Sequence, residues 1–220
     1  MQRSTIIVAG GSGKRMGGPI PKQFMLAKGR PLLCWAIEAF HACDQAMPII
    51  VVLPEAQIPI WKALCIGHGF LIEHQIVVGG EERFHSTRNG LSAVKGEGVV
   101  AVHDGVRPLV SKELIARCFA AGEEHGAAIP VVPVTSSIRQ VDEKSSKAID
   151  RSSLRAVQTP QCFRTDLLRK AFEQAYDPAF TDEATLVERM GVKVALVEGE
   201  ESNIKVTTAT DLKVVELELG

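Results

Sequence analysis

Short apolar runs alternate with longer amphipathic stretches along most of the chain. The apolar runs are rich in Val, Ile and Ala and show little two-residue alternation, which is typical of strands covered on both faces. They predict strands at residues 5–9, 49–53, 76–78, 99–103, 127–132 and 193–197. The amphipathic stretches predict helices at 31–42, 58–66, 84–94, 111–125, 165–175, 181–190 and 209–219. This βαβ alternation predicts an α/β fold in which a mostly parallel sheet carries helices on both faces.

Three of the predicted helices have recognisable start signals. Pro31 suits a first helical position, and Ser111 suits an N-cap because an acid follows it in the first turn. Thr181 can cap the helix that it opens, without any functional role.

One polar segment, at 136–158, breaks the alternation. Two short β-like pieces flank a polar turn at 142–147. We expect a β-arm that projects from the sheet, since a polar segment of this length inside a compact domain favours a function or an interface. A solvated surface hairpin is the plainer alternative. The chain shows no repeat, low-complexity tract or linker, so we predict a single domain over 1–220.

Composition excludes several broad classes of protein. The 220 residues are 45% hydrophobic and carry a formal net charge of −1, so no basic excess draws the chain to nucleic acid or an anionic membrane. The five cysteines are scattered, odd in number and without a C-x-x-C pair, which favours reduced, buried thiols. No basic segment precedes a long apolar stretch at the N-terminus, and no apolar run approaches the ~20 residues of a membrane span. We therefore expect a cytoplasmic protein.

The strongest local feature is the glycine-rich segment after the first strand, Ala9-Gly10-Gly11-Ser12-Gly13-Lys14-Arg15-Met16-Gly17-Gly18. Glycines let the backbone approach a phosphate and direct its N–H groups toward it. A Walker A loop needs Ser or Thr where Arg15 stands, and a Rossmann fingerprint needs glycine where Met16 stands. Lys14, Arg15 and the nearby Lys22 place three cations around this loop. They favour triphosphate binding over solvated surface charge.

Further candidate residues follow later strands. Gly79-Gly80-Glu81-Glu82-Arg83-Phe84-His85-Ser86 is either a tight turn or a place for groups that read a base. Asp104 and Arg107 stand just beyond a buried strand, where they can hold Mg²⁺ or a sugar hydroxyl and a phosphate, or form an internal ion pair. Lys205 interrupts an apolar run, which is uncommon unless its ammonium has a partner.

Taken in order, these motifs resemble the 2-C-methyl-D-erythritol 4-phosphate cytidylyltransferase family. The matching pieces span nearly the whole chain: Ala9-Gly10-Gly11-x-Gly13-x-Arg15-Met16, Pro21-Lys22-Gln23, Gly79-Gly80-Glu81-x-Arg83-x-x-Ser86, His103-Asp104-Gly105-Val106-Arg107-Pro108, Asp150-Arg151, Thr159-Pro160-Gln161, Thr181-Asp182-Glu183-Ala184 and Asn203-Ile204-Lys205-Val206-Thr207. Each piece is modest alone, and the ordered set is specific.

The resemblance implies a Rossmann-like domain with a β-arm that forms a homodimer, and it implies CTP, a polyol phosphate and a divalent cation, usually Mg²⁺ carried on the CTP phosphates. The implied catalytic residues are Arg15, Lys22, Arg151 and Lys205. The implied CTP-binding residues are Ala9, Gly10, Gly11, Gly13, Lys14, Gly80, Glu81, Ser86, Asp104 and Gly105. The implied acceptor-binding residues are Asp104, Arg107, Ser137, Arg151, Thr159, Thr181 and Lys205.

The chain departs from the family pattern at a few positions. The family often has two alanines where this chain has Gly105-Val106, and an Asp in the arm where this chain has Ser136. Glu81 stands where Asp is also common. Two other functions remain open: a ribitol 5-phosphate cytidylyltransferase, which has similar loops, and a nucleotide-binding regulator without catalysis. The joint presence of Arg15, Lys22 and Lys205 argues against the regulator.

Overall fold

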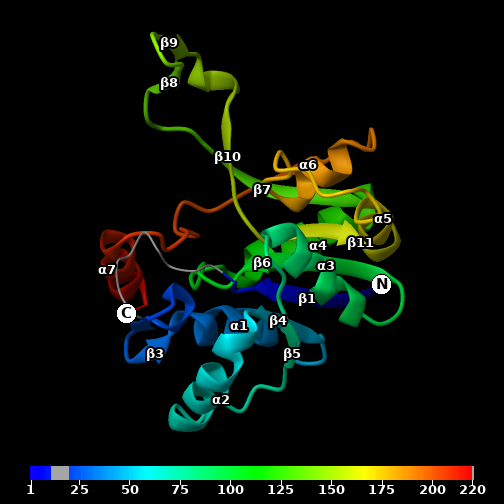
Figure 1. Ribbon diagram of the computed structural model, residues 1–220, viewed down its shortest axis with the longest axis vertical. Helices are drawn as coiled ribbons and strands as arrows, with labels where there is room; N and C mark the ends of the chain where they lie inside the picture. Colours follow the sequence, from blue (N-terminus) through cyan, green and yellow to red (C-terminus); the bar gives the residue numbers. More distant parts are fainter. Residues whose placement is uncertain (11–19, 220) are drawn as a thin grey trace.

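One twisted sheet of eight strands forms the centre of the molecule (Figure 1). The computed structural model describes residues 1–10 and 20–219. The sheet strands are β1 (Gln2–Val8), β4 (Ile49–Leu53), β5 (Gln75–Val78), β6 (Gly98–Asp104), β7 (Ala127–Pro133), β10 (Arg155–Val157), β11 (Gln161–Arg164) and β12 (Ala195–Glu198). Their order is β10-β7-β11-β6-β1-β4-β5, with β12 paired to β7.

The sheet is mixed and mostly parallel, as predicted. β5, β4, β1 and β6 pair in parallel, and so do β12 and β7. All six predicted strands are present. The sequence pattern does not predict β10 and β11, which run antiparallel to their neighbours. Each of these two strands is short, three and four residues long, and neither forms a continuous apolar run.

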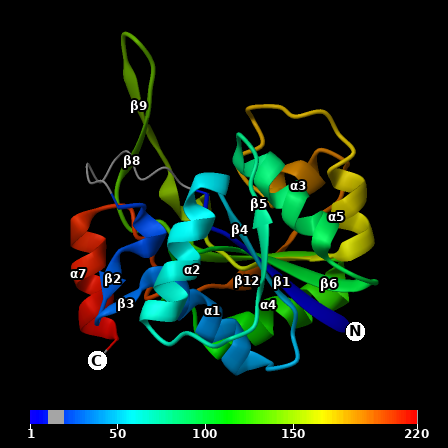
Figure 2. The same cartoon turned by 60° about the horizontal axis from the view of Figure 1, so that its bottom comes forward.

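Helices cover both faces because the central strands bury side chains on both sides (Figure 2). The helices are α1 (Leu32–Cys43), α2 (Ile58–Gly67), α3 (Arg83–Ala93), α4 (Lys112–His125), α5 (Thr165–Ala171), α6 (Glu183–Glu188) and α7 (Ala209–Glu218). In β1, Ile7 faces the core under α1, α2 and α4, while Ile6 faces the core under α3, α5 and α6. A third, smaller core joins α7 to the hairpin of β2 (Leu26–Ala27) and β3 (Arg30–Pro31).

The helix boundaries correct two of the start signals. Ser111 caps α4 as predicted, since its side chain accepts from the Leu114 N–H at 2.9 Å. Pro31 instead ends β3 and is the N-cap of α1, one position before the helix. Thr181 is not a cap: the carboxylate of Asp182 accepts the Thr185 N–H, so α6 begins at Glu183. A carboxylate is at least as good a cap as a hydroxyl, and it sits one residue later.

The expected β-arm is a hairpin of β8 (Ile138–Val141) and β9 (Ser146–Ile149) that stands away from the body in both views. A single 3₁₀ turn follows at Arg151–Ser153. The expected range of 136–158 extends too far, because β10 returns to the sheet and pairs with β7. Within residues 1–10 and 20–219, no helix has the length and apolar character needed to cross a bilayer.

The first residues of β6 pack so closely against β1 that a side chain added there should lower the stability of the fold. A Cβ atom at Gly98 would lie 2.0 Å from the carbonyl oxygen of Gln2, so Gly98→Ala forces two backbones apart. We expect it to lower the free energy of unfolding by about 1–3 kcal/mol in urea denaturation. Gly67→Ala at the end of α2 is the control, because nothing lies within 4 Å of the added methyl group. Equal stability of the two variants would contradict this account.

Candidate functional site

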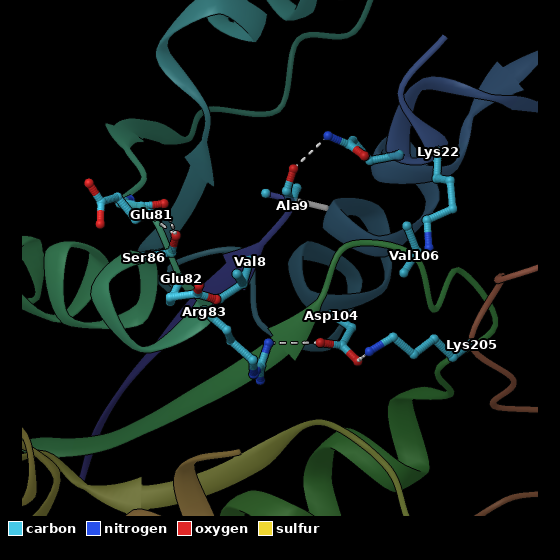
Figure 3. A pocket seen from close by; sticks show the side chains of 13 residues that line it. Val8, Ala9, Lys22, Glu81, Glu82, Arg83, Ser86, Asp104, Val106 and Lys205 are labelled. Atoms are coloured by element: carbon cyan, nitrogen blue, oxygen red, sulfur yellow. Dashed lines mark hydrogen bonds and ion pairs between the residues drawn. The ribbon is translucent and has the colours of Figure 1, made fainter. Parts of the chain in front are cut away.

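Two cavities lie side by side where the parallel strands end. The larger, of about 310 Å³, is lined by Val8, Ala9, Gly10, Lys22, Gln23, Gly80, Glu81, Glu82, Arg83, Ser86, Asp104, Val106 and Lys205. The smaller, of about 180 Å³, is lined by Arg83, Asp104, Arg107, Val157, Gln158, Thr159, Gln161, Thr181, Asp182 and Lys205. Both linings include Arg83, Asp104 and Lys205, so these three side chains form a wall shared by the two cavities (Figure 3).

Asp104, the last residue of β6, is the centre of this wall. Its side chain is only 8% exposed, yet three cations reach it. Arg83 donates to Oδ1 at 2.9 Å, and Lys205 donates to Oδ2 at 2.9 Å. Arg107 approaches Oδ2 at 3.4 Å. Burial alone would raise the pKa of Asp104, but the charges of Arg83, Lys205 and Arg107 outweigh burial and hold that pKa well below its usual range.

Arg83 links Asp104 to a second buried carboxylate. Its other terminal nitrogen donates to Glu183 at 2.7 Å, and the hydroxyl of Thr87 donates to the other oxygen of Glu183 at 2.8 Å. Burial lowers the pKa of Arg83, but the charges of Glu183 and Asp104 more than compensate and raise it. Neither Arg83 nor Glu183 is assigned a role by the sequence, although both belong to the matching motifs. Both are charged residues in the first turn of a helix, and both are followed in the sequence by buried residues. That pattern could have identified them.

The Arg107 side chain makes its main contacts with other groups of the protein. Its guanidinium donates to the carbonyl of Asn203 at 2.8 Å, besides its contact with Asp104. Burial lowers the pKa of Arg107 against the opposing effect of Asp104. The sequence left two interpretations of Asp104 and Arg107 open, and the structure contains the internal ion pair. Lys205 also has the partner that its place in an apolar run predicts.

A buried histidine fixes the backbone beneath Asp104. The carbonyl of Arg107 can only accept, so His103 Nε2, at 3.1 Å, carries the proton. His103 Nδ1 then accepts from the Thr159 hydroxyl at 3.0 Å, and that hydroxyl oxygen accepts the Asp104 N–H at 3.1 Å. The hydroxyl of Thr159 thus holds Asp104 in place from within the protein.

The glycine turn before α3 forms another side of the larger cavity. The Gly80 N–H donates to the Ser86 hydroxyl at 3.1 Å, which closes the turn. A Cβ atom at Gly80 would lie 2.3 Å from the Cβ of His85, so the turn has no space for a side chain. Gly80, Glu81 and Ser86 all line the cavity, and Gly10 lies opposite, where an added Cβ would be 3.7 Å from the Ser86 hydroxyl.

The structure brings together many of the residues that the resemblance implies. The larger cavity contains Ala9, Gly10, Lys22, Gly80, Glu81, Ser86, Asp104 and Lys205, and the smaller contains Asp104, Arg107, Thr159, Thr181 and Lys205. Lys22 is 7% exposed and extends from a 3₁₀ turn at Lys22–Phe24 into the larger cavity (Figure 3). Gly11, Gly13, Lys14 and Arg15 lie outside the described residues.

Three other expected residues are not in either lining. Gly105 lies behind the wall, where its N–H donates to the Val8 carbonyl at 3.0 Å. Ser137 and Arg151 belong to the arm and are exposed. The Arg151 guanidinium donates to the Thr135 carbonyl within the arm. One chain alone therefore does not bring Arg151 to the cavities.

All five cysteines are free thiols without the character of a nucleophile. Burial raises the pKa of Cys34 and of Cys118 to about 12, and that of Cys65 to about 11. A thiol with such a pKa stays protonated and unreactive near neutral pH. In the part of the chain that the structure describes, no group of three or more His, Cys, Asp or Glu side chains could hold a metal ion.

Comparison with known proteins identifies the family. The model of the IspD family, 2-C-methyl-D-erythritol 4-phosphate cytidylyltransferase, matches residues 4–220. The chain belongs to the 2-C-methyl-D-erythritol 4-phosphate cytidylyltransferase family. Relatives of that name from Bacteroides fragilis and Phocaeicola vulgatus are 53% and 52% identical, over 97% and 99% of this chain and 98% and 99% of theirs. The crystal structure of such an enzyme from Thermus thermophilus superposes with a TM-score of 0.81, at 34% identity, over 99% of this chain and 98% of that one.

One departure from the pattern of the cytidylyltransferase family has a structural reason. A Cβ atom at Gly105 would lie 3.0 Å from the Cβ of Ala9 and from a methyl group of Leu33. The alanine that the family pattern suggests would therefore need its neighbours to shift by a few tenths of an ångström. The next side chain, Val106, lines the larger cavity (Figure 3).

Burial of His103 generates a pH prediction. Burial lowers the pKa of this imidazole from 6.5 to about 4. Above pH 6.5 neither the folded nor the unfolded chain protonates it, so its contribution to stability is complete. Between about pH 6.5 and 4 only the unfolded chain takes up the proton, and the free energy of unfolding should fall by on the order of 3 kcal/mol as pH drops through this window.

Urea denaturation from pH 7 to 4 measures this loss. His103→Gln is the comparison, since it keeps a polar side chain but cannot titrate, while the other five histidines remain in both proteins. We expect a smaller pH slope in the variant. Parallel slopes would show that His103 does not titrate in this way.

Proposed function

We propose that this chain transfers the cytidylyl group of CTP to 2-C-methyl-D-erythritol 4-phosphate and releases pyrophosphate. The observation that carries the proposal is the pair of cavities with one charged wall, found in a member of the cytidylyltransferase family. The larger cavity, with the glycine turn, suits the nucleotide. The smaller cavity, with Arg107 and Thr181 in its lining, suits the acceptor.

The reaction is a substitution at phosphorus. A phosphate oxygen of the acceptor attacks the α-phosphorus of CTP, and the bond from that phosphorus to the oxygen bridging to the β-phosphorus breaks. Pyrophosphate leaves with the bonding electron pair. The protein supplies no nucleophile, so its contribution is to position both phosphates and to stabilise the charge on their oxygens.

The described cations are suited to this task. Lys22 enters the larger cavity and Lys205 belongs to the wall, so the two ammonium groups can approach the phosphates from different sides. Since Lys205 is held by Asp104, it is oriented before any ligand arrives. We assign Lys22 and Lys205, with Arg15 of the glycine-rich segment, to stabilising the charge that grows at the α-phosphate.

We propose that Mg²⁺ enters with the triphosphate. The larger cavity contains three carboxylates, but both oxygens of Asp104 are engaged by cations, which leaves Glu81 and Glu82. Such a set suits Mg²⁺ that is held mainly by substrate phosphates and water. When bound, the ion neutralises part of the phosphate charge.

We also propose that the enzyme is a homodimer and that the arm completes the partner's site. The arm stands clear of its own body, and Arg151 is exposed on it. A guanidinium suits bidentate capture of the acceptor phosphate. Ser137 on the same arm can add a hydroxyl. The free thiols favour a reducing compartment such as the cytoplasm.

Release of pyrophosphate tests the activity. We expect it to require CTP, Mg²⁺ and methylerythritol 4-phosphate together, with CTP preferred over ATP, GTP and UTP. Ribitol 5-phosphate is the control acceptor, and it should be turned over much more slowly. Faster turnover of ribitol phosphate would refute the acceptor, and no reaction with either polyol phosphate would refute the enzymatic role.

Mixing two inactive variants tests the shared site. Lys22→Ala should lose mainly kcat, roughly 10²-fold, because it removes a donor to the developing charge. Arg151→Ala should also be nearly inactive. In a mixed dimer one site carries both lesions and the other carries neither, so activity should return when subunits exchange. If labelled subunits exchange and the mixture stays inactive, Arg151 acts within its own chain.

A further inference from the structure

Glu183 is a buried carboxylate for which the proposed reaction has no direct use. It is 2% exposed and belongs to the lining of neither cavity of the site. Its two oxygens accept from Arg83 at 2.7 Å and from Thr87 at 2.8 Å. An ionised carboxylate is costly to bury, so its position needs these partners. Its effect on the site can pass only through what it holds.

Arg83 and Thr87, which hold Glu183, both belong to α3. This helix lies close on the sheet, since a Cβ atom at its Gly90 would be 2.7 Å from a methyl group of Ile6 and 2.8 Å from one of Val52. Phe84 and Leu91 of the same helix are buried in the core. α3 is therefore held firmly on the sheet, and the turn that closes the nucleotide side of the site leads directly into this helix.

The segment before Glu183 connects this carboxylate to the acceptor side of the site. Residues 173–182 form turns and bends without a regular helix or strand, and Thr181 and Asp182 from this segment line the smaller cavity. Gln161 donates to Asp182 at 2.9 Å, and Phe180 stacks on Phe84 of α3 with ring centroids 6.0 Å apart. Glu183 directly follows this segment as the first residue of α6, and its ion pair with Arg83 joins it to α3.

Arg83 also determines how Asp104 is oriented. One end of its guanidinium binds Oδ1 of Asp104 while the other end binds Glu183. This leaves Oδ2 toward Lys205 and Arg107. A change at Glu183 therefore reaches the acceptor cavity by two routes: through the position of Thr181, and through the orientation of the Asp104 carboxylate that holds Lys205.

We propose that Arg83 and Glu183 are a positioning pair which affects the affinity of the enzyme for the acceptor phosphate more strongly than its affinity for CTP. The proposal rests on the proposed function. The asymmetry follows from the position of Glu183. It directly follows Thr181 and Asp182, which line only the smaller of the two cavities, whereas the glycine turn on the nucleotide side keeps its hydrogen bond to Ser86 when the pair is broken.

The test separates the two affinities. Glu183→Gln keeps the shape of the side chain and removes its charge. We expect the KM for methylerythritol 4-phosphate, at saturating CTP, to rise on the order of tenfold. The Kd of CTP, from calorimetry without acceptor, should stay within about twofold of the wild-type value, since a merely destabilised protein would not separate the two constants.

Two further variants keep the test independent of any folding defect in Glu183→Gln. Arg83→Lys keeps the positive charge but replaces the planar fork with a single ammonium, which cannot bridge both carboxylates as the guanidinium does. It should raise the acceptor KM in the same way. Thr87→Val removes only the hydroxyl that donates to Glu183 and should raise that KM less.

Glu123→Gln is the matched control. It breaks a different Arg–Glu pair, in which Arg3 donates to both oxygens of Glu123 at 2.9 and 3.2 Å, near the opposite end of β1 from the cavities. We expect no change in either constant. Wild-type turnover is measured first, and its absence would refute the proposed function instead. With an active wild type, an unchanged acceptor KM, or an equal rise in the Kd of CTP, overturns the role of the pair.

Discussion

The described part of the site depends on one buried carboxylate that is surrounded by cations. Asp104 ends β6 and receives Arg83 from α3, Lys205 from the segment before α7 and Arg107 from its own turn. A buried carboxylate left without any cation is an uncompensated charge, which typically costs about 3–5 kcal/mol. The carboxylate therefore orients three elements that come from distant parts of the sequence. With Glu183 included, three cations face two carboxylates, and this set keeps a net charge of +1 toward the space where phosphates are expected.

The fold could be predicted from the sequence wherever a single strand or helix carries its own signal. Ile49–Leu53 is an uninterrupted apolar run and was placed at its observed bounds. β11 could not be found in this way, since four residues give too short a pattern and its position depends on pairing with β6 and β7. The arm was found because it breaks the alternation. Its end was misplaced, since only the pairing of β10 with β7 shows where the chain rejoins the sheet.

The candidate site also combines residues that have a signal in the local sequence with residues that only contacts between distant parts of the chain identify. Lys205 was predicted to need a partner, because an ammonium in an apolar run is unfavourable to leave unpaired. That the partner is Asp104 became clear only in three dimensions. Glu183 and Arg83 are 100 residues apart in the chain, and neither has a local pattern that points to the other. The resemblance to the family supplied the residues that are expected to touch ligands, whereas the buried contacts behind them required the structure.

The shared wall has a consequence for inhibitor design. Under the proposed assignment of the cavities, a molecule that fills only the larger one competes directly with the nucleotide and resembles what many other nucleotide-binding proteins accept. A molecule that spans both cavities must carry a linker past Arg83, Asp104 and Lys205. At this point an anionic group or a strong hydrogen-bond acceptor can replace Asp104 as the partner of the Lys205 ammonium. Such a compound is a bisubstrate analogue whose selectivity comes from the junction, because proteins that bind nucleotides without a second cavity offer it only half of its contacts.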